Sequence, residues 1–357
     1  MLKEIHEQPN AVTETFRGRI KPQEGEIILD GITDKDLLDF ERIVIVACGT
    51  AWHAGLVTKF YIERLTKIPV EVDYASEFRY RTPIVNDRTL FICVSQSGET
   101  ADTLGSLDLA KKQGAKTLAI CNAVGSTISR RVDNIIYTHA GPEISVASTK
   151  AFSTQLTAAL LLALKLADLR KTITKKELSK HLEDLMLLPS LISSALETDK
   201  QVEKIAKKYG KTEHLLYLGR GLLYPIALEG ALKLKEISYI HAEGYPSGEM
   251  KHGPIALIDN ELPVVVLFGK DGQNYEKTMS NLIEVESRGG RIIAVTDIAV
   301  PELKDLAWET IELGEMSPLL MPIVFSVPLQ LLSYHAAIYL GTDVDQPRNL
   351  AKSVTVE

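Results

Sequence analysis

Short apolar runs alternate with helical stretches along this chain, and the whole alternation occurs twice. The first copy has predicted strands at Arg42–Ala47, Pro69–Tyr74, Thr89–Val94, Ala115–Cys121 and Asn134–His139, and predicted helices at Ala51–Leu65, Ala101–Gln113 and Phe152–Leu166. The second copy starts again at His214–Leu218 and continues through Pro263–Phe268 and Asn281–Thr296. Strands that alternate with helices through short loops predict a parallel sheet covered on both faces. The fold class is therefore predicted as α/β, with two tandem doubly wound parallel-sheet domains.

The length of the chain agrees with this organisation. At 357 residues, of which 45% are apolar and 24% charged, the chain is long enough for two domains of ordinary size. The predicted parts are a polar leader over residues 1–40, a first α/β domain over 41–171, a charged and solvated helical connector over 172–210, a second α/β domain over 211–341 and a C-terminal tail over 342–357.

A cluster of small polar side chains follows the third predicted strand of the first copy. Ser95, Gln96, Ser97 and Thr100 lie between Thr89–Val94 and the next predicted helix. The carboxyl end of a strand and the amino end of a helix gather unpaired N–H groups, which suit a phosphate. The loop contains no lysine, so it is not a P-loop. The alternative is a plain helix N-cap, made by Ser97 or Gly98.

The corresponding corner of the second copy has a different composition. Gly269–Gln273 lacks the hydroxyl cluster that follows the third strand of the first copy. A plain cap does not explain why one copy alone carries the hydroxyls. The pattern favours a duplication in which one phosphate site is retained, at the strand ends where open α/β sheets bind ligands.

Charge and cysteine content exclude several other classes. A net charge of −7 does not indicate the excess of positive charge that binding to nucleic acid or to an acidic membrane surface requires. Three cysteines at the ends of apolar runs fit reduced thiols in a cytoplasmic protein, and their spacing indicates no metal site. A nucleophilic role for Cys48 is disfavoured, because no activating group except His53 is indicated nearby.

Two segments could be mistaken for membrane signals. The N-terminus carries acidic residues and lacks the apolar core of a signal peptide. Met316–Thr342 contains no Asp, Glu, Lys or Arg, but it holds three prolines and several polar residues. We predict a buried or subunit-interface helix there and no membrane span.

Several motifs together resemble a known family. The stretch Ser95–Thr103 with Cys48–Gly49–Thr50 resembles the sugar isomerase (SIS) fold, which is flavodoxin-like. The segments Val146–Phe152, Glu229–Ile237, Lys251–Pro254 and Asp343–Glu357 narrow the resemblance to the isomerase half of the glucosamine-6-phosphate synthase family. The resemblance covers nearly the whole chain.

The resemblance implies a reaction and a set of roles. Fructose 6-phosphate would be bound and its ring opened, ammonia would replace the C2 oxygen, and a proton would move between C1 and C2 to give glucosamine 6-phosphate. His252 suits ring opening, Glu236 resembles the family's base, and Lys352 matches a tail lysine with Schiff-base chemistry. The remaining residues that the resemblance assigns are Lys233 to catalysis, Ser95, Gln96, Ser97 and Thr100 to the phosphate, and Thr50, Val146 and Ser148 to the sugar. No cofactor or metal is implied.

The chain also departs from the family pattern. Nothing in it matches a glutaminase domain, so it is expected to be either part of a longer enzyme or a stand-alone isomerase that takes ammonia from a missing glutaminase. Ala51 stands where many relatives carry serine, which puts one substrate contact in doubt. By resemblance the protein is a homodimer in which His252 reaches the neighbouring active site.

Other interpretations stand beside this one. Without the motifs, Glu229, Lys233 and Glu236 would indicate an exposed salt-bridge ladder, His252 a loop residue and Lys352 part of a disordered tail. The joint resemblance to the family overturns these three interpretations. An SIS-type deaminase or deglycase would act on another amino-sugar phosphate, and a sugar-phosphate-sensing module would need the hydroxyl loop alone.

Overall fold

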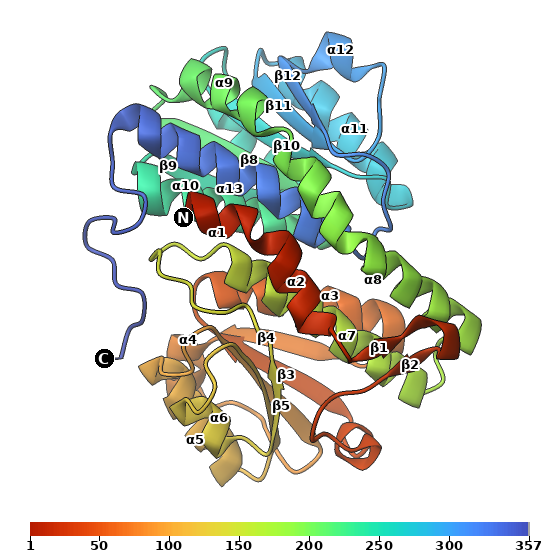
Figure 1. Ribbon diagram of the computed structural model, residues 1–357. Coiled ribbons are helices and arrows are strands. Elements are labelled where there is room, and N and C mark those ends of the chain that lie inside the picture. The colour runs from red at the N-terminus through yellow and green to blue at the C-terminus, as the bar shows by residue number, and fades with distance from the viewer. Residues whose placement is uncertain (356–357) are drawn as a thin grey trace. The chain divides into compact units, whose positions relative to one another are not determined.

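The computed structural model describes residues 1–355, apart from the side chain of Gln273, so Val356 and Glu357 of the predicted tail lie outside the described residues. The chain forms two compact units, each built around one parallel sheet (Figure 1). The β3–β7 unit comprises Asn10–Glu143, Lys150–Leu187 and the chain from Ala351 onward; the β8–β12 unit comprises Met1–Pro9, Ile144–Thr149 and Leu188–Leu350. The units interleave along the chain, and the predicted boundaries at residues 40, 171, 210 and 341 stay predictions.

The sheet of the β3–β7 unit has the strand order β4-β3-β5-β6-β7, with every neighbouring pair parallel. Its strands are β3 (Arg42–Ala47), β4 (Val70–Tyr74), β5 (Thr89–Ser95), β6 (Lys116–Cys121) and β7 (Asn134–Tyr137). Its helices include α3 (Thr50–Thr66), α4 (Ala75–Tyr80), α5 (Ala101–Lys112), α6 (Thr127–Arg131) and α7 (Lys150–Leu169). This is the flavodoxin-like order, in which the chain reverses direction across the sheet between β3 and β5.

Both faces of this sheet are covered, as the nearly continuous apolar runs predict. Val46 and Phe91 pack on one face with Phe78 of α4 and Leu107 of α5. On the other face α3 approaches closely, since a Cβ on its Gly55 would lie 3.1 Å from Ile45 of β3. The predicted doubly wound architecture is therefore confirmed in this unit.

The β8–β12 unit repeats the same plan. Its sheet has the order β9-β8-β10-β11-β12, again parallel throughout. The strands are β8 (His214–Gly219), β9 (His241–Pro246), β10 (Pro263–Phe268), β11 (Arg291–Thr296) and β12 (Glu309–Glu312). The helices are α1 (Leu2–His6), α9 (Asp199–Tyr209), α10 (Tyr224–Ser238), α11 (Gln273–Glu286), α12 (Leu303–Leu306) and α13 (Met321–Leu340), with short 3₁₀ helices η3 (Gly221–Leu223), η4 (Ser247–His252) and η5 (Pro254–Leu257).

Among residues 1–355 two helices are long and apolar enough to cross a membrane, and most of each apolar window is buried inside the protein. The apolar window of α7 is 83% buried and that of α13 is 72% buried. In the β8–β12 unit a glycine brings α10 close to both neighbours: a Cβ on Gly230 would lie 2.7 Å from Leu329 of α13 and 2.9 Å from the ring of Tyr217. The apolar character of α13 is thus explained by core packing, as predicted for Met316–Thr342.

Two local predictions need correction, and the predicted leader gains assigned elements. The last strand of the first copy ends at Tyr137 and not at His139, whose φ of +54° is incompatible with a strand. The predicted solvated connector forms α8 (Lys175–Leu196) and α9, and both bury one side, including Leu178, Leu182, Leu185, Leu188 and Ile192 of α8. The predicted leader contains α1, α2 (Gln8–Phe16), the strand pair β1 (Ile20–Lys21) and β2 (Glu26–Ile27), and two 3₁₀ turns, η1 (Pro22–Glu24) and η2 (Asp34–Leu37).

Candidate active site

The segment Ser95–Thr100, here called the hydroxyl loop, lies where β5 ends and before α5 begins. Because β3 and β5 are parallel neighbours on either side of the chain reversal, the hydroxyl loop and the β3–α3 turn lie at the same edge of the sheet. Gly98 fixes the shape of the loop: its φ is +66°, and a Cβ there would lie 2.1 Å from Ser126 Oγ. The loop therefore occupies the position that open α/β sheets use for ligands.

Hydrogen bonds hold the hydroxyl loop in place. The Oγ of Ser95 accepts a bond of 2.9 Å from Gly98 N, and the Oγ of Ser97 accepts one of 3.2 Å from Glu99 N. The N-cap of α5 is Thr100, without a side-chain capping bond, so the alternative that Ser97 or Gly98 caps this helix is wrong. Gln96, Ser97 and Thr100 are half-buried, which leaves part of each side chain accessible to a ligand.

The β3–α3 turn contributes Thr50, the first residue of α3. Gly49 precedes it at φ +54°, a conformation that favours glycine. Ala51 follows Thr50 on α3 and is half-buried. Burial raises the pKa of the Cys48 thiol, whose Sγ lies 3.9 Å from Thr103 Oγ1, so the environment opposes a thiolate nucleophile there.

The C-terminal tail reaches the hydroxyl loop within the β3–β7 unit. Ser353 Oγ lies 3.0 Å from Ser97 Oγ, and the carbonyl of Val354 accepts a bond of 3.1 Å from Ala101 N at the start of α5. Lys352 Nζ lies 2.5 Å from a carboxylate oxygen of Glu143. The prediction that the tail packs on the protein and is not disordered is confirmed for these residues.

Glu143 is a residue that the sequence reasoning missed. Its side chain is fully buried, while that of Lys352 is 25% exposed. Its second oxygen accepts a bond of 3.0 Å from Ala151 N at the start of α7. The carboxylate is therefore held by a helix start and presents its other oxygen to the lysine. In the sequence, this role was indicated only by the presence of a single acidic residue before the Val146–Phe152 motif.

The β8–β12 unit holds a second charged group, on α10. Lys233 Nζ lies 2.5 Å from Glu236 Oε2 and 3.4 Å from Glu229 Oε1. The side chains of Lys233 and Glu229 are 1% and 2% exposed, and that of Glu236 is 21% exposed. The ladder is thus buried, contrary to the exposed ladder that spacing alone would suggest. A buried lysine between two carboxylates fixes their orientation, and only Glu236 keeps a partly open face.

The other predicted residues of this unit differ in how firmly they are held. Val146 N donates a bond of 3.0 Å to the carbonyl of Asp345, at the base of the tail. Ser148 is half-buried two residues further on. His252 ends η4 with an exposed side chain, and no hydrogen bond or ion pair joins it to another residue among residues 1–355.

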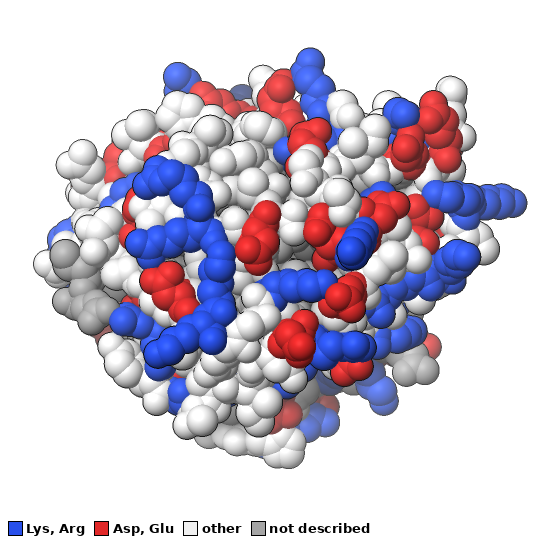
Figure 2. All heavy atoms as spheres, turned by 90° about the horizontal axis from the view of Figure 1, so that it is seen from below, with Lys and Arg blue, Asp and Glu red and all other residues white. Residues whose placement is uncertain are grey.

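Surface charge and the arrangement of potential metal-binding side chains add two observations about the kind of ligand. On the face shown in Figure 2, Lys and Arg side chains are interspersed with Asp and Glu side chains, which gives no continuous positive surface for nucleic acid. Within residues 1–355 no group of three or more His, Cys, Asp or Glu side chains is arranged to hold a metal ion.

Comparison with known proteins places these features in a family. The SIS domain profile matches residues 36–165 and 208–340. The chain is 52% identical over 359 aligned residues to the isomerizing glutamine:fructose-6-phosphate aminotransferase of Chlorobaculum tepidum, covering 100% of this chain and 58% of that protein. The chain thus spans less than two thirds of the length of the curated relatives it matches.

Solved structures agree with the sequence comparison. The C-terminal domain of glucosamine-fructose-6-phosphate aminotransferase from Francisella tularensis superposes with a TM-score of 0.91 at 47% identity, over 97% of both chains. A glucosamine-6-phosphate deaminase from Thermotoga maritima gives a TM-score of 0.75 at 26% identity, over 99% of this chain and 98% of that one. With two matched segments and two sheets of the same order, the chain belongs to the SIS domain family and carries two SIS domains in tandem.

Proposed function

We propose that this chain catalyses the isomerase half-reaction of glucosamine 6-phosphate synthesis. Fructose 6-phosphate is the substrate. Lys352 forms an imine at C2 with release of the C2 oxygen as water, ammonia then displaces the lysine amine, and a proton moves from C1 to C2 to give the amino-sugar phosphate. No redox change is required, because the ketone at C2 is exchanged for an imine and the double bond then moves to C1. The relatives with this activity named above match the chain from end to end.

The observation that carries the proposal is the docking of the Lys352 segment on the hydroxyl loop. A phosphate needs several donors, and Ser95, Ser97 and Thr100 offer hydroxyls at the amino end of α5. An imine requires an amine close to the bound sugar, and Ser353 ties the neighbouring lysine to Ser97 of that loop at 3.0 Å. These contacts support a proposed phosphate site and a proposed Schiff-base lysine at one edge of one sheet.

Glu143 gives this lysine a defined protonation chemistry. An ammonium group cannot attack a carbonyl, so Lys352 must lose a proton before it forms an imine. The contact of 2.5 Å between Lys352 Nζ and Glu143 offers a direct path for this proton, and its transfer to the carboxylate frees the amine when a sugar carbonyl arrives. We assign Glu143 to positioning Lys352 and to accepting its proton.

Glu236 is the proposed base for the movement of the proton between C1 and C2. A carboxylate can remove a proton from one carbon and return it to the next if it stays fixed over both. Lys233, almost fully buried, holds Glu236 Oε2 at 2.5 Å and so restricts its rotation. His252 is proposed for ring opening, because an imidazole can give and take a proton near neutral pH. Val146 and Ser148 are proposed sugar contacts together with Thr50.

The assembly and the nitrogen source also belong to the proposal. We propose a homodimer in which the exposed His252 serves the partner's substrate, and a cytoplasmic location, which suits three free cysteines. Mixing a Glu236→Gln variant with a His252→Ala variant tests the shared site. One working site should be recovered in each mixed dimer, and absent recovery after verified subunit exchange contradicts sharing.

Product analysis is the direct test of the reaction. The purified chain is incubated with fructose 6-phosphate, with and without ammonium, and the sugars are identified by NMR. We expect glucose 6-phosphate slowly in both reactions, glucosamine 6-phosphate when ammonium is present, and no nitrogen transfer from glutamine. Absence of any conversion by a folded chain that binds fructose 6-phosphate would leave the sensing-module alternative.

The deaminase alternative is supported by the fold similarity to the Thermotoga protein. It predicts that ammonia is released preferentially from an amino-sugar phosphate other than glucosamine 6-phosphate. Comparing kcat/KM for ammonia release from several amino-sugar phosphates separates the two functions. A clear preference for another amino-sugar phosphate contradicts the proposed synthesis.

A further inference from the structure

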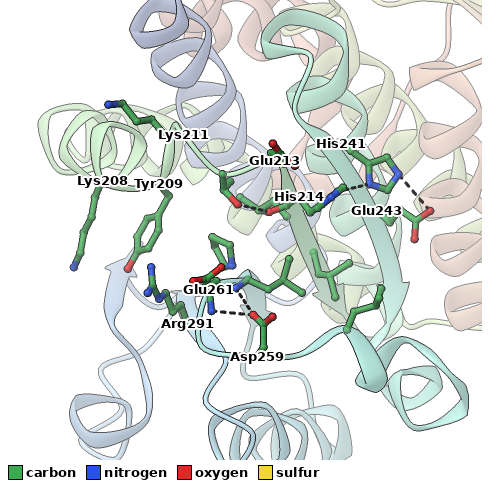
Figure 3. A pocket seen from close by; sticks show the side chains of 16 residues that line it. Lys208, Tyr209, Lys211, Glu213, His214, His241, Glu243, Asp259, Glu261 and Arg291 are labelled. Atoms are coloured by element: carbon green, nitrogen blue, oxygen red, sulfur yellow. Dashed lines mark hydrogen bonds and ion pairs between the residues drawn. The ribbon is translucent and has the colours of Figure 1, made fainter.

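The β8–β12 unit has a pocket at the edge of its sheet where the strands begin (Figure 3). Its volume is about 740 Å³, and its lining includes the first residues of four strands: His214, His241, Pro263 and Arg291. Substrates of open α/β sheets bind at the opposite, carboxyl edge. The pocket therefore lies away from every residue of this unit's carboxyl edge and needs a separate explanation.

Two imidazoles meet in this pocket. His214 and His241 are direct cross-strand partners in the parallel pair β8–β9. Their Nδ1 atoms lie 3.2 Å apart, and the rings are nearly perpendicular at 83°, with centroids 5.3 Å apart. The two nitrogens point toward one another in Figure 3. A direct hydrogen bond between them uses one lone pair and one N–H, so the same two atoms can instead offer two lone pairs when that proton leaves.

The separation of the two nitrogens matches the separation of two ligands on one metal ion. A zinc–imidazole bond is about 2.0–2.1 Å, and two such bonds at the tetrahedral angle place the nitrogens about 3.3–3.4 Å apart. The observed 3.2 Å is close to this value. Both side chains are exposed, so small ring rotations can direct both lone pairs at one point. We infer that His214 and His241 form a two-histidine binding site for a divalent transition metal ion, for which Zn²⁺ is the probe.

The surroundings of the pair support a cation. Glu243 Oε1 lies 3.8 Å from Nε2 of His241, the nitrogen that faces away from His214. A carboxylate on this side adds negative charge close to the position of a bound cation. The pocket's cationic residues are Lys208 of α9, Lys211 of the segment before β8, and Arg291 of β11. In Figure 3 all three lie across the pocket from the imidazoles.

The number of ligands limits the strength of the site. Two imidazoles leave the remaining coordination positions to water from the pocket, since no third His, Cys, Asp or Glu completes the group within residues 1–355. Binding should be weaker than in a structural zinc site with four protein ligands. Because the ligands come from adjacent strands, a bound ion also joins the first residues of β8 and β9 and should raise the thermal unfolding midpoint.

Zn²⁺ titration of the whole chain tests the site. The test variants are His214→Gln, His241→Gln and the double variant. The control is His6→Gln, which removes an exposed histidine of α1. We expect one Zn²⁺ per chain in the parent and in His6→Gln, and an affinity at least tenfold lower in the other variants. Zn²⁺ should raise the unfolding midpoint of the parent and of His6→Gln, and not that of the other variants. Zn²⁺ affinity in the folded double variant equal to that of the parent would overturn the site.

Cu²⁺ electron paramagnetic resonance provides a readout on the unmodified chain. We expect coupling to two nitrogens in the parent and to one in a single variant, and weaker binding at pH 5.5 than at pH 7.5 because protons compete for the imidazoles. Coupling to no imidazole nitrogen in the parent contradicts the inference even if a variant fails to fold. Conversion of fructose 6-phosphate should be unchanged in both single variants, so this test is independent of the proposed reaction.

Discussion

The two sheets of this protein have the same strand order but different chemistry at equivalent corners. After β5 the chain carries hydroxyls and a docked tail, with Ser97 and Ser353 in contact at 3.0 Å. After β10 the equivalent corner is filled by charged groups: Lys270 N donates a bond of 3.0 Å to Asp297, and Lys270 Nζ lies 3.2 Å from Glu315. A common scaffold thus sets where a ligand can bind, and the side chains at the corner decide whether one does.

Glycines at the two corners show the same contrast. A Cβ on Gly98 would collide with Ser126, whereas a Cβ on Gly272, the N-cap of α11 at φ +53°, has no heavy atom within 4 Å. At the first corner the glycine is both in a left-handed backbone conformation and tightly packed against neighbouring side chains. At the second corner the glycine has the left-handed conformation without close neighbours. Substitutions at these two glycines can therefore separate the effect of packing from the effect of backbone conformation.

The largest expected difference concerns lysines at the two corners. Lys352→Arg keeps the charge that pairs with Glu143 but cannot form an imine, so we expect the rate of glucosamine 6-phosphate formation to fall by about 1,000-fold or more. Lys270→Arg, at the second corner, should leave the rate unchanged. Product formation with ammonium measures both, and a comparable rate in Lys352→Arg reduces Lys352 to a tail contact.

Replacing the glycine at each corner by alanine should lower the free energy of unfolding by different amounts. Gly98→Ala combines backbone strain with steric overlap at 2.1 Å from Ser126 Oγ, and we expect a loss of about 3–5 kcal/mol in the free energy of unfolding. Gly272→Ala adds strain alone and should cost about 1–3 kcal/mol. Urea unfolding of both variants checks the order, and equal losses would mean that the packing behind the hydroxyl loop relaxes freely.

Hydroxyl removal should affect binding at one corner only. Ser97→Ala and Thr100→Ala each remove a donor to a charged oxygen, so we expect fructose 6-phosphate binding to weaken by about 1–3 kcal/mol. Asn274→Ala, whose side chain bonds Asp271 at the second corner, is the control and should bind normally. Calorimetric titration measures all three, and unchanged affinity in both hydroxyl variants ends the phosphate assignment.

The smallest effect concerns the buried carboxyl at the second corner. Burial raises the pKa of Asp297, so the folded state favours its protonated form and its contribution to stability falls as pH rises from about 4. Asp297→Asn should therefore be more stable than the parent by about 1 kcal/mol at pH 7, with the advantage vanishing near pH 4.

Asp259→Asn should change the free energy of unfolding in the opposite direction. Bonds from the N–H groups of Glu261 and Leu262 lower the pKa of Asp259, so its contribution is present above about pH 4 and is lost as pH falls. This variant should be less stable than the parent at neutral pH. Urea unfolding of both variants at pH 7 and near pH 4 checks these two predictions. If the free energy of unfolding depends on pH in the same way in the parent and in Asp297→Asn, the predicted effect of burial is contradicted.

Sequence patterns predicted the strands closely because parallel strands buried on both faces are nearly continuous apolar runs. Arg42–Ala47 and Pro263–Phe268 have the predicted bounds. The buried stripe of α8 was missed, although its leucines recur at helical spacing, because the charged residues between them dominate the composition. Glu143 was missed because a single acidic residue in a loop has no periodicity, and only tertiary structure brings Lys352 to it across the chain.

The docked tail also determines how late in synthesis the hydroxyl loop receives its last contacts. Ser97 and Ser353 are separated by 256 residues, yet both belong to the β3–β7 unit. At about 5–20 residues per second, translation needs roughly 13–50 s to go from the first serine to the second. During this time the strands β3 to β7 can pair, but Ser97 has no Ser353 to contact. The hydroxyl loop therefore acquires its final surroundings well after its own sheet has been synthesised.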